Sequence, residues 1–373
     1  MTLTIFTLTH KSFNTPTDPM YQPLQVGSAV HGDLGYIRDD SGENISNLNC
    51  YYSELTGFYW IWKNHHSSDY VGTCHYRRYL LNEQEKIFTK REYEQLLKEY
   101  DLITTKRVKL NNSYHFGFSA NHNIHALDVT GEVIKELHPK YYEMFLKLVN
   151  GPETYFGNIM VTSKALFDEY CEWLFSIFFE VQKRIDMETD EDEYHKRVFG
   201  FISEFLLLVW VRVKKLKVYE CKVGMIGEKA ETREMKERLA AYFKEKDIDG
   251  AKAYFIKQQK ARPDVLMEAS DITGELRLSM QIIATADEEK KRYGTSILEK
   301  ENDYRKLISF FTKLNQVVSA YKVGIETIED KQFLSDSRLT KAAVWIAVLI
   351  LPMEHENKQL LEEKLQKEFD TQI

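Results

Sequence analysis

Short apolar runs alternate with helical stretches over the first 225 residues, and this alternation limits the fold more than any other feature. The strand-like runs are 3–8, 70–74, 101–105, 158–162 and 218–223. The helical stretches are 46–63, 90–100, 133–149, the segment after Ser163, and 199–214. Such alternation favours an α/β sheet covered by helices. In these sheets, ligands bind beyond the carboxyl ends of the strands, so polar residues there are the candidates for a site.

The character of the chain changes near Gly227. Beyond it Lys and Glu dominate, Gly is sparse, and helical spacing is continuous. The expected helices are 232–246, 248–260, 263–283, 296–323, 339–351 and 357–369. The sequence therefore predicts an α/β domain over residues 1–226 and a C-terminal all-α helical domain over 227–373, with no chemistry apparent in the second part.

Composition and charge exclude several classes of protein. A net charge of −7 argues against a nucleic-acid partner, and four scattered cysteines without a CxxC pair argue against a zinc knuckle or a disulfide scaffold. The start of the chain lacks the pattern of a signal peptide, and the apolar run 342–351 is too short to span a bilayer. We expect a cytoplasmic protein with a buried helix at 342–351. The alternative for that run is a homodimer contact or a peripheral contact at the inner face of the membrane.

Two arginines directly follow an apolar strand in segment 70–80, YVGTCHYRRYL. His75, Arg77 and Arg78 there make a local positive site in an acidic protein. Arginine presents a planar fork of donors that matches phosphate oxygens, so a diphosphate is the natural ligand. The structural alternative pairs one arginine with a buried carboxylate and leaves the other solvated.

A second polar segment, 36–49, precedes a helix that Ser46 is expected to cap. Asp39, Asp40 and Asn44 lie around Gly42, which permits a tight turn. These side chains suit the hydroxyls of a ribose or a sugar. The same pattern fits a turn with a helix N-cap, and the spacing alone favours that interpretation.

Two polar clusters bear on metal binding. Residues 190–193 are four consecutive carboxylates, hard ligands that bridge Mg²⁺ or Mn²⁺ to phosphate, but their place after a helix favours a solvated loop. His115, His122 and His125 share a polar segment without ligand-spaced cysteines, which favours substrate contact or a hydrated loop over zinc. The sequence leaves the metal open, with Mn²⁺ or Mg²⁺ as the candidates.

Glu204 is the only carboxylate in the apolar segment 198–211. Desolvation raises the pKa of such a carboxyl group towards the range of a general base. The alternative is a buried ion pair with Arg197 or with an arginine at a strand end. No GxSxG, HExxH, GxGxxG or P-loop pattern occurs, which excludes the commoner hydrolases, dehydrogenases and NTPases.

Several segments occur together, in order, in one family of bacterial glycosyltransferases. They are QVGSAV, DDSGENISNLN, YYSELTGFYWIWKN, YVGTCHYRRYL, FDEYCEWLF and RVFGFISE. Residues 1–225 resemble this family, which carries a domain-of-unknown-function label and occurs in capsular and exopolysaccharide gene clusters. Its characterised members look like galactofuranosyltransferases. The resemblance implies an α/β, GT-A-like nucleotide-sugar-binding domain.

The family pattern is matched residue by residue at the proposed donor site. The matching residues are Asp39, Asp40, Asn44, His75, Tyr76, Arg77, Arg78 and Asn158. One departure is Phe205, which stands where relatives carry an arginine in the pattern FGF-x-x-ER. If that arginine holds donor phosphate or orients Glu204, its loss alters specificity or activity.

These observations predict an inverting glycosyltransferase that moves a sugar, galactofuranose by resemblance, from a UDP-sugar to a surface polysaccharide or lipid-linked glycan. Glu204 is the expected base, and His115 and His122 are expected to bind the acceptor. The expected donor-binding residues are Thr9, His10, Lys11, Asp39, Asp40, Asn44, His75, Arg77, Arg78 and Asn158. The arginines can replace a metal as the charge-neutralising element. The competing hypothesis is a non-catalytic scaffold that binds nucleotide sugar or glycan and recruits assembly partners through its helical part.

Overall fold

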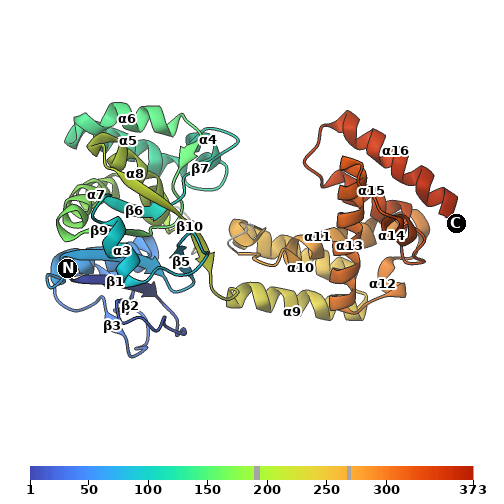
Figure 1. Ribbon diagram of the computed structural model, residues 1–373, viewed down its shortest axis with the longest axis horizontal. Helices are drawn as coiled ribbons and strands as arrows, with labels where there is room; N and C mark the ends of the chain where they lie inside the picture. The colour runs from blue at the N-terminus through green and yellow to red at the C-terminus, as the bar shows by residue number, and fades with distance from the viewer. Residues whose placement is uncertain (189–193, 267–269, 373) are drawn as a thin grey trace. The chain divides into compact units, whose positions relative to one another are not determined.

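Residues 1–188, 194–266 and 270–372 are described by the computed structural model, in which the chain divides into two units, Met1–Gly227 and Glu228–Ile373 (Figure 1). The first unit contains all the described strands, and the described elements of the second are helices. The α/β class expected for the first part and the helical structure expected for the second are both present. Residues 190–193, the acidic run considered for a metal, lie outside the described residues.

One eight-stranded sheet forms the centre of the first unit. Its strands are β1 (Leu3–Thr9), β2 (Tyr21–Gln25), β3 (Ile37–Arg38), β4 (Tyr70–His75), β5 (Arg78–Leu81), β6 (Leu102–Thr105), β9 (Met160–Ser163) and β10 (Val218–Met225). Their order is β3-β2-β1-β4-β5-β10-β6-β9, and β9 also pairs with β4. The short strands β7 (Val108–Lys109) and β8 (Glu153–Thr154) form a separate pair.

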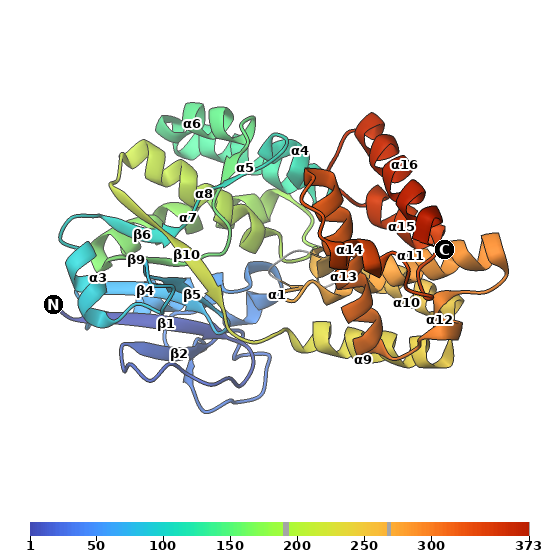
Figure 2. The ribbon, with the colours of Figure 1, turned by 45° about the vertical axis from the view of Figure 1, so that its right-hand side comes forward.

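The parallel half of the sheet contains a point where the strand order reverses. Strands β3, β2, β1 and β4 are parallel to one another, whereas β5 and β9, which also pair with β4, are antiparallel to it. The chain leaves β1 towards β2 and β3 and returns to the other side of β1 as β4, which Figure 2 shows beside β1 and β5. Ligands of open α/β sheets bind in the crevice at such a reversal, beyond the carboxyl ends of the two strands.

Strand β1 is buried along its whole length, because helices cover both faces of the sheet. Phe6 and Leu8 face the larger core with helices on one side, while Leu3 and Ile5 face a smaller core beneath α3. Figure 1 shows α5, α6, α7 and α8 gathered on the first side. The helices are α1 (Asn49–Tyr52), α2 (Leu55–Asn64), α3 (Lys90–Leu96), α4 (Tyr114–Ser119), α5 (Ile124–Leu137), α6 (Pro139–Val149), α7 (Lys164–Arg184) and α8 (Val198–Lys214), with a 3₁₀ turn at Ser46–Leu48.

Two helices that the sequence predicts as continuous are broken. The stretch 46–63 becomes a 3₁₀ turn followed by α1 and α2, with a break at Ser53 and Glu54. Its first residue, Ser46, does not cap it, because the Ser46 hydroxyl donates to Asp39 Oδ1 instead. The stretch 133–149 is divided at Pro139, which begins α6. By contrast, Ser163 caps α7 as expected, since its hydroxyl accepts the N–H of Leu166.

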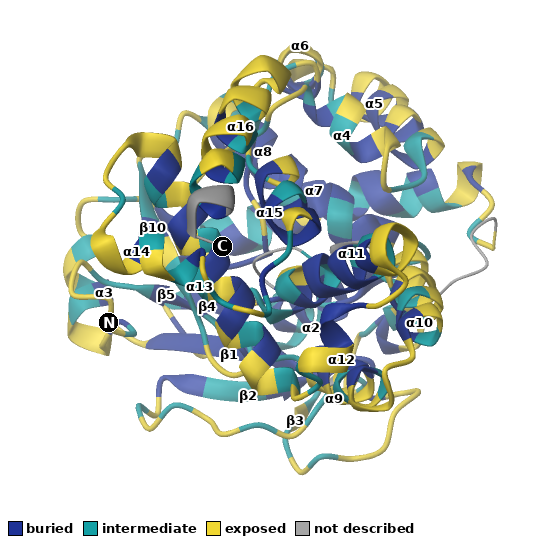
Figure 3. Cartoon of the chain, turned by 90° about the vertical axis from the view of Figure 1, so that its right-hand side faces the viewer, coloured by how far each residue is buried: buried dark blue, intermediate teal, exposed yellow. Residues whose placement is uncertain are grey.

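The second unit is a helical assembly around its own hydrophobic core. Its helices are α9 (Ala230–Glu245), α10 (Ile248–Ala261), α11 (Glu275–Tyr293), α12 (Ile297–Lys300), α13 (Tyr304–Val323), α14 (Ile328–Phe333), α15 (Lys341–Leu349) and α16 (His355–Gln372), with a 3₁₀ turn at Pro263–Leu266. Helix α16 buries Leu361, Leu365 and Phe369, one residue per turn, and shows an exposed outer face (Figure 3). Most of α15 is buried, as expected for the apolar run 342–351. In the described parts of the chain, no helix combines the length and apolar character needed to cross a bilayer.

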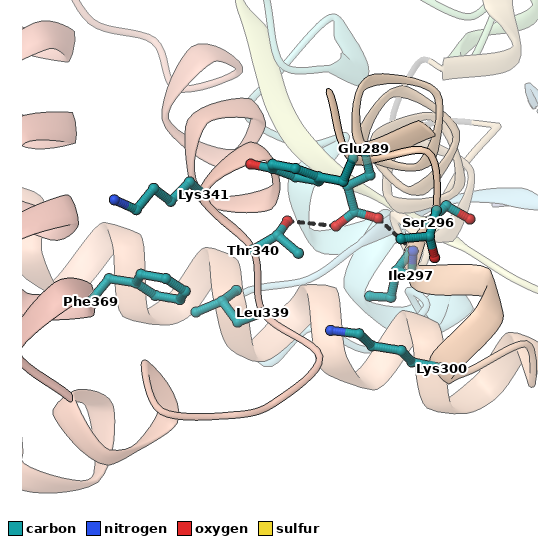
Figure 4. A pocket seen from close by; sticks show the side chains of 10 residues that line it. Glu289, Ser296, Ile297, Lys300, Leu339, Thr340, Lys341 and Phe369 are labelled. Carbon is teal, nitrogen blue, oxygen red and sulfur yellow. Dashed lines mark hydrogen bonds between the residues drawn. The ribbon is translucent and has the colours of Figure 1, made fainter. Parts of the chain in front are cut away.

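A pocket of about 370 Å³ lies within this helical unit (Figure 4). At its floor the buried Glu289 carboxylate accepts hydrogen bonds of 2.5 Å from the backbone N–H of Ile297 and the hydroxyl of Thr340. Burial raises the pKa of Glu289. These bonds join α11 to the starts of α12 and α15, so the carboxylate has a structural role at a helix junction.

The N-terminal unit is expected to fold without the helical unit. Strand β10 pairs with both β5 and β6, and Ile226 N donates to Arg77 O at 2.8 Å, so the fragment must extend through Gly227. Because each unit has its own core, residues 1–227 should unfold cooperatively and show the same affinity as the full chain for UDP, the nucleotide expected from the sequence. Thermal unfolding and calorimetry test this. A well-folded fragment that has lost UDP binding would place part of the site in residues 228–373.

Candidate active site

The two arginines lie at the reversal point of the sheet. In the parallel pair β1–β4, Leu8 is opposite His75, and the next residue, Tyr76, donates its N–H to Leu8 O at 3.1 Å. The chain then turns back, so that Arg77 lies in the hairpin turn and Arg78 is the first residue of β5. This hairpin was not expected from the sequence. It brings both arginines to the carboxyl end of β4.

His75 is held neutral at this strand end. Burial is the main reason that its pKa lies well below the ordinary value, followed by the positive charges of Arg78 and Arg77. Among the described residues, Nδ1 of His75 and Nε of Arg78 are buried without a hydrogen-bond partner. Buried polar groups are normally hydrogen-bonded, so the unsatisfied Nε–H of the Arg78 guanidinium at a strand end suits an anionic ligand.

An aromatic rim lies beside the arginines, where β1 ends. The ring of Tyr76 packs against His10 at 5.7 Å and Phe13 at 5.9 Å between centroids, and Phe13 packs against Tyr36 at 5.7 Å. All four side chains retain exposed surface. Aromatic faces of this kind stack on nucleobases.

Glu204 lies on α8, and its carboxylate contacts the loop before β9. Its Oε1 accepts the N–H of Gly157 at 2.8 Å. Desolvation, and secondly the negative charge of Glu54, raise the pKa of Glu204 to about 7, although Arg78 and Arg197 oppose the shift. No ion pair within 4 Å joins Glu204 to an arginine among the described residues, so the alternative of a buried ion pair is not what the structure contains.

The loop that holds Glu204 is a tight turn at Gly157 and Asn158. Gly157 has φ +76°, a conformation that favours glycine, and the Nη1 atom of Arg78 would be 3.5 Å from a Cβ at that position. The buried Asn158 amide is used at both ends: its nitrogen donates to Glu54 Oε1 at 2.7 Å, and its oxygen accepts from Ser203 Oγ at 3.0 Å. The Asn158 side chain thus holds the turn, and contact between Asn158 and the donor stays a prediction.

The break between α1 and α2 supplies Glu54. Ser53 has φ +51°, unusual for a residue with a side chain, and Gly200 approaches it so closely that a Cβ on Gly200 would lie 3.3 Å from Ser53 Oγ. The hydroxyl of Ser53 accepts from Nε of Arg197 at 2.8 Å. No role for Glu54 follows from the sequence, because the apolar spacing of 46–63 continues across the break and gives no sign of the break. The only local signal is a charged residue between two apolar helical faces.

An aromatic wall continues from Glu204 along α8. Phe201 lies one turn before Glu204 and stacks on His122, with centroids 4.1 Å apart. It also packs against Tyr194 with the rings tilted, at 5.1 Å between centroids. Burial lowers the pKa of His122 to about 4, so its ring is neutral. Acceptor contact by His122 and His115 stays a prediction. His115 does not join this wall, since its exposed ring bonds Asp128 at 3.0 Å.

Several predicted donor residues form hydrogen bonds in the framework around the site. Asp39 is fully buried, and its carboxylate accepts the backbone N–H groups of Gly27 and Ser28 at 2.9 Å. Asn44 bonds the backbone of its own turn, as the alternative of a turn suggested, although no side chain caps the 3₁₀ turn that follows. Thr9 exchanges bonds with the backbone of Lys11, and so shapes the end of β1. Donor contact by Thr9, Asp39 and Asn44 stays a prediction.

The remaining predicted donor residues keep exposed surface near the strand ends. His10 and Lys11 follow β1 directly, and Asp40 is partly exposed while it pairs with Arg38 at 2.6 Å. For these three residues donor contact stays a prediction. Within residues 1–188, 194–266 and 270–372, the structure contains no group of three His, Cys, Asp or Glu side chains arranged to hold a metal ion.

Phe205, the departure from the family pattern, lies in the hydrophobic core. Its ring stacks on Tyr114 with centroids 4.2 Å apart and meets Phe145 edge-on at 5.8 Å. The next residue on a helix is turned by about 100°, so Phe205 faces away from the side that carries Glu204. The positive charges acting on Glu204 come from Arg78 and Arg197.

One solved structure is similar to part of this chain. The apo structure of WbbM, a bifunctional glycosyltransferase, matches with a TM-score of 0.55 and 27% sequence identity. The match covers 61% of this chain and 46% of WbbM, so the chain spans less than half the length of that protein. No curated protein matches the sequence.

The family assignment rests on the first unit. The model of the family described as Domain of unknown function (DUF4422) matches residues 4–215, which include every site residue discussed above. This match spans more than half of the 373 residues. The chain therefore belongs to the DUF4422 family.

Proposed function

We propose that this protein is a glycosyltransferase that uses a nucleotide-diphosphate sugar. The observation that carries the proposal is the meeting, in one unit, of two features: Arg78 at the strand reversal, whose Nε is buried without a hydrogen-bond partner among the described residues, and Glu204 on α8, whose pKa is raised to about 7. The similarity to WbbM, a bifunctional glycosyltransferase, supports the same class of reaction. The parallel half of the sheet, with its site at the strand ends, supports a GT-A-like nucleotide-sugar domain.

In the proposed reaction, Arg77 and Arg78 bind the diphosphate and stabilise the charge it gains as leaving group. The aromatic rim of His10, Phe13, Tyr36 and Tyr76 receives the base, for which uracil is our proposal. The acceptor hydroxyl lies against the wall of Phe201 and His122. Its proton passes to Glu204 as its oxygen attacks the anomeric carbon. The bond from that carbon to the diphosphate oxygen breaks, and its electron pair stays on the diphosphate. Because the acceptor oxygen attacks from the opposite face, the configuration at the anomeric carbon is inverted.

We further propose galactofuranose as the sugar and a surface polysaccharide or lipid-linked glycan as the acceptor. Arginine donors can neutralise the diphosphate without Mg²⁺ or Mn²⁺, so we expect transfer to continue in the presence of a chelator.

The test is a comparison of UDP-sugars with the full-length protein. Ligands that bind the native state raise its melting temperature, so UDP and the cognate UDP-sugar should do so. Release of UDP from UDP-galactofuranose, with and without a glycan acceptor, then measures turnover. Binding without turnover on any donor and acceptor would favour a non-catalytic binding protein, and an absence of binding by all nucleotides would contradict the proposal.

A further inference from the structure

Glu54 is a charged residue of this site to which the proposed reaction gives no role. We propose that Glu54 is a positioning residue for Glu204: it holds the Gly157–Asn158 turn from one side while Glu204 accepts the amide of that turn from the other. This inference rests on the proposed function, in which Glu204 is the base. It adds a second carboxylate that acts on the first and does not touch the substrate.

The path between the two carboxylates is short and buried. Glu54 Oε1 accepts from Asn158 Nδ2 at 2.7 Å, and the same nitrogen donates to Gly200 O at 3.2 Å. One residue earlier in the turn, Gly157 N donates to Glu204 Oε1 at 2.8 Å. The Glu204 carboxylate therefore bonds a dipeptide that Glu54 also holds.

Contacts from other elements leave this dipeptide little freedom. The hydroxyl of Thr73, on β4, donates to Asn158 O at 3.1 Å, and Ser203 on α8 donates to Asn158 Oδ1 at 3.0 Å. A turn held by the sheet, by α8 and by Glu54 keeps the amide of Gly157 directed at Glu204. Loss of the hydrogen bond to Glu54 is expected to release that amide.

The backbone beside Glu54 is strained in a way that serves this placement. Ser53 has φ +51°, and such a conformation persists where the surroundings enforce it. Here the enforcing contacts are Arg197, which donates to Ser53 Oγ, and the close approach of Gly200. A regular helix through this point would not turn Glu54 towards Asn158.

Charge is the second means by which Glu54 acts. The groups that act on Glu204 are Glu54 from the helix break, Arg78 from β5, the amide of Gly157, and Arg197 at the start of the helix that carries Glu204 itself. Tyr114 on α4 also faces this carboxylate: burial and, secondly, the charge of Glu204 raise the pKa of Tyr114. Two of the groups that act on Glu204 are cations, which lower its pKa. Glu54 is the anion among them and raises it, so its charge helps to keep Glu204 able to accept and release a proton near neutral pH.

The experiment is a carbon-13 titration of the glutamate carboxyl groups in the full-length protein. The resonance that disappears in Glu204→Gln identifies Glu204. In Glu54→Gln the amide oxygen still accepts from Asn158, but the negative charge is gone. The midpoint of Glu204 should therefore move to lower pH, by about one unit, a usual perturbation in folded proteins. Glu136→Gln removes a surface carboxylate paired with Arg184 and serves as the matched control, with no shift expected.

Kinetics add a second measurement that a merely structural role would not move. In Glu54→Gln the acid limb of the pH profile of kcat/KM should shift to lower pH, in parallel with the titration. Glu54→Ala should also lower kcat, because the bond to Asn158 is lost, with the KM for the donor unchanged. An unchanged Glu204 midpoint in Glu54→Gln, or wild-type kcat in a folded Glu54→Ala, would overturn the inference. Either of these results would leave the proposed function intact. The role of Glu204 as the base in that function fails separately, if Glu204→Gln retains turnover.

Discussion

Glu204→Gln is expected to lower the rate of sugar transfer by about 10²–10⁴-fold, the usual contribution of a general base. The amide of glutamine still accepts the N–H of Gly157, so the loop keeps its place, but it cannot take the proton of the acceptor hydroxyl. Affinity for the donor should stay within a few-fold, because the arginines that bind the diphosphate are unchanged. Initial rates of UDP release and calorimetry with UDP measure the two effects.

The same substitution is expected to stabilise the protein at alkaline pH. The pKa of Glu204 is raised from 4.5 to about 7 in the folded state, so the folded protein binds this proton more tightly than the unfolded chain. The resulting stability is complete below pH 4.5 and is lost as the pH rises to about 7. At pH 8, Glu204→Gln should therefore exceed the wild type by up to about 3 kcal/mol, and this difference should vanish near pH 4.

Urea unfolding of the two proteins across this pH range tests the sign. If Glu204→Gln were the less stable protein at pH 8, Glu204 would be an ionised partner of Arg78 or Arg197. A variant with wild-type turnover would remove Glu204 as the base.

Arg78→Ala is expected to weaken the binding of UDP by about 10- to 100-fold, since a hydrogen bond to a charged group contributes about 1.5–3 kcal/mol. The Nε of Arg78 is buried without a partner among the described residues, and its Nη1 lies beside Gly157. Arg78→Lys keeps the charge but not the fork of donors, so its affinity should be intermediate. Calorimetry at two salt concentrations separates the Coulombic part from the geometric part.

A second effect distinguishes Arg78 from a cation that only binds phosphate. Arg78 lowers the pKa of Glu204, so in Arg78→Ala the acid limb of kcat/KM should move to higher pH, opposite to the shift expected for Glu54→Gln. Arg184→Ala removes a surface arginine paired with Glu136 and Glu180, and is the matched control. Unchanged UDP affinity in both Arg77→Ala and Arg78→Ala would contradict the assignment of the diphosphate site.

Much of the framework is encoded in local patterns of residues. Runs of β-branched and aromatic residues are enough to predict β1, β4, β6, β9 and β10, since side chains on both faces of a covered sheet are apolar. The change of composition near Gly227 indicates the helical unit in the same way. The position of Arg77 and Arg78 directly after an apolar strand already indicates an anion site at a strand end.

Local patterns could not reveal which polar side chains are free to meet a ligand. Asp39 and Asn158 match the family pattern as well as Arg78 does, yet the side chains of both form hydrogen bonds inside the protein. Whether a side chain faces a ligand depends on what other segments offer it. The partners of Asn158 lie more than 40 residues away in sequence and leave no periodic signal. The break at Ser53 is hidden for the same reason, because the contact that accompanies it comes from Gly200.

The sequence by itself determined the alternation of strands and helices in the first part, the separation of a helical part, and a carboxylate at position 204 in an apolar helix. Only the tertiary structure decided the pKa of that carboxyl group. Its pKa depends on the loss of water around it and on charges at positions 54, 78 and 197, which folding brings together. Desolvation and Coulombic interaction act through space, so they are fixed by neighbours in three dimensions and not by neighbours along the chain.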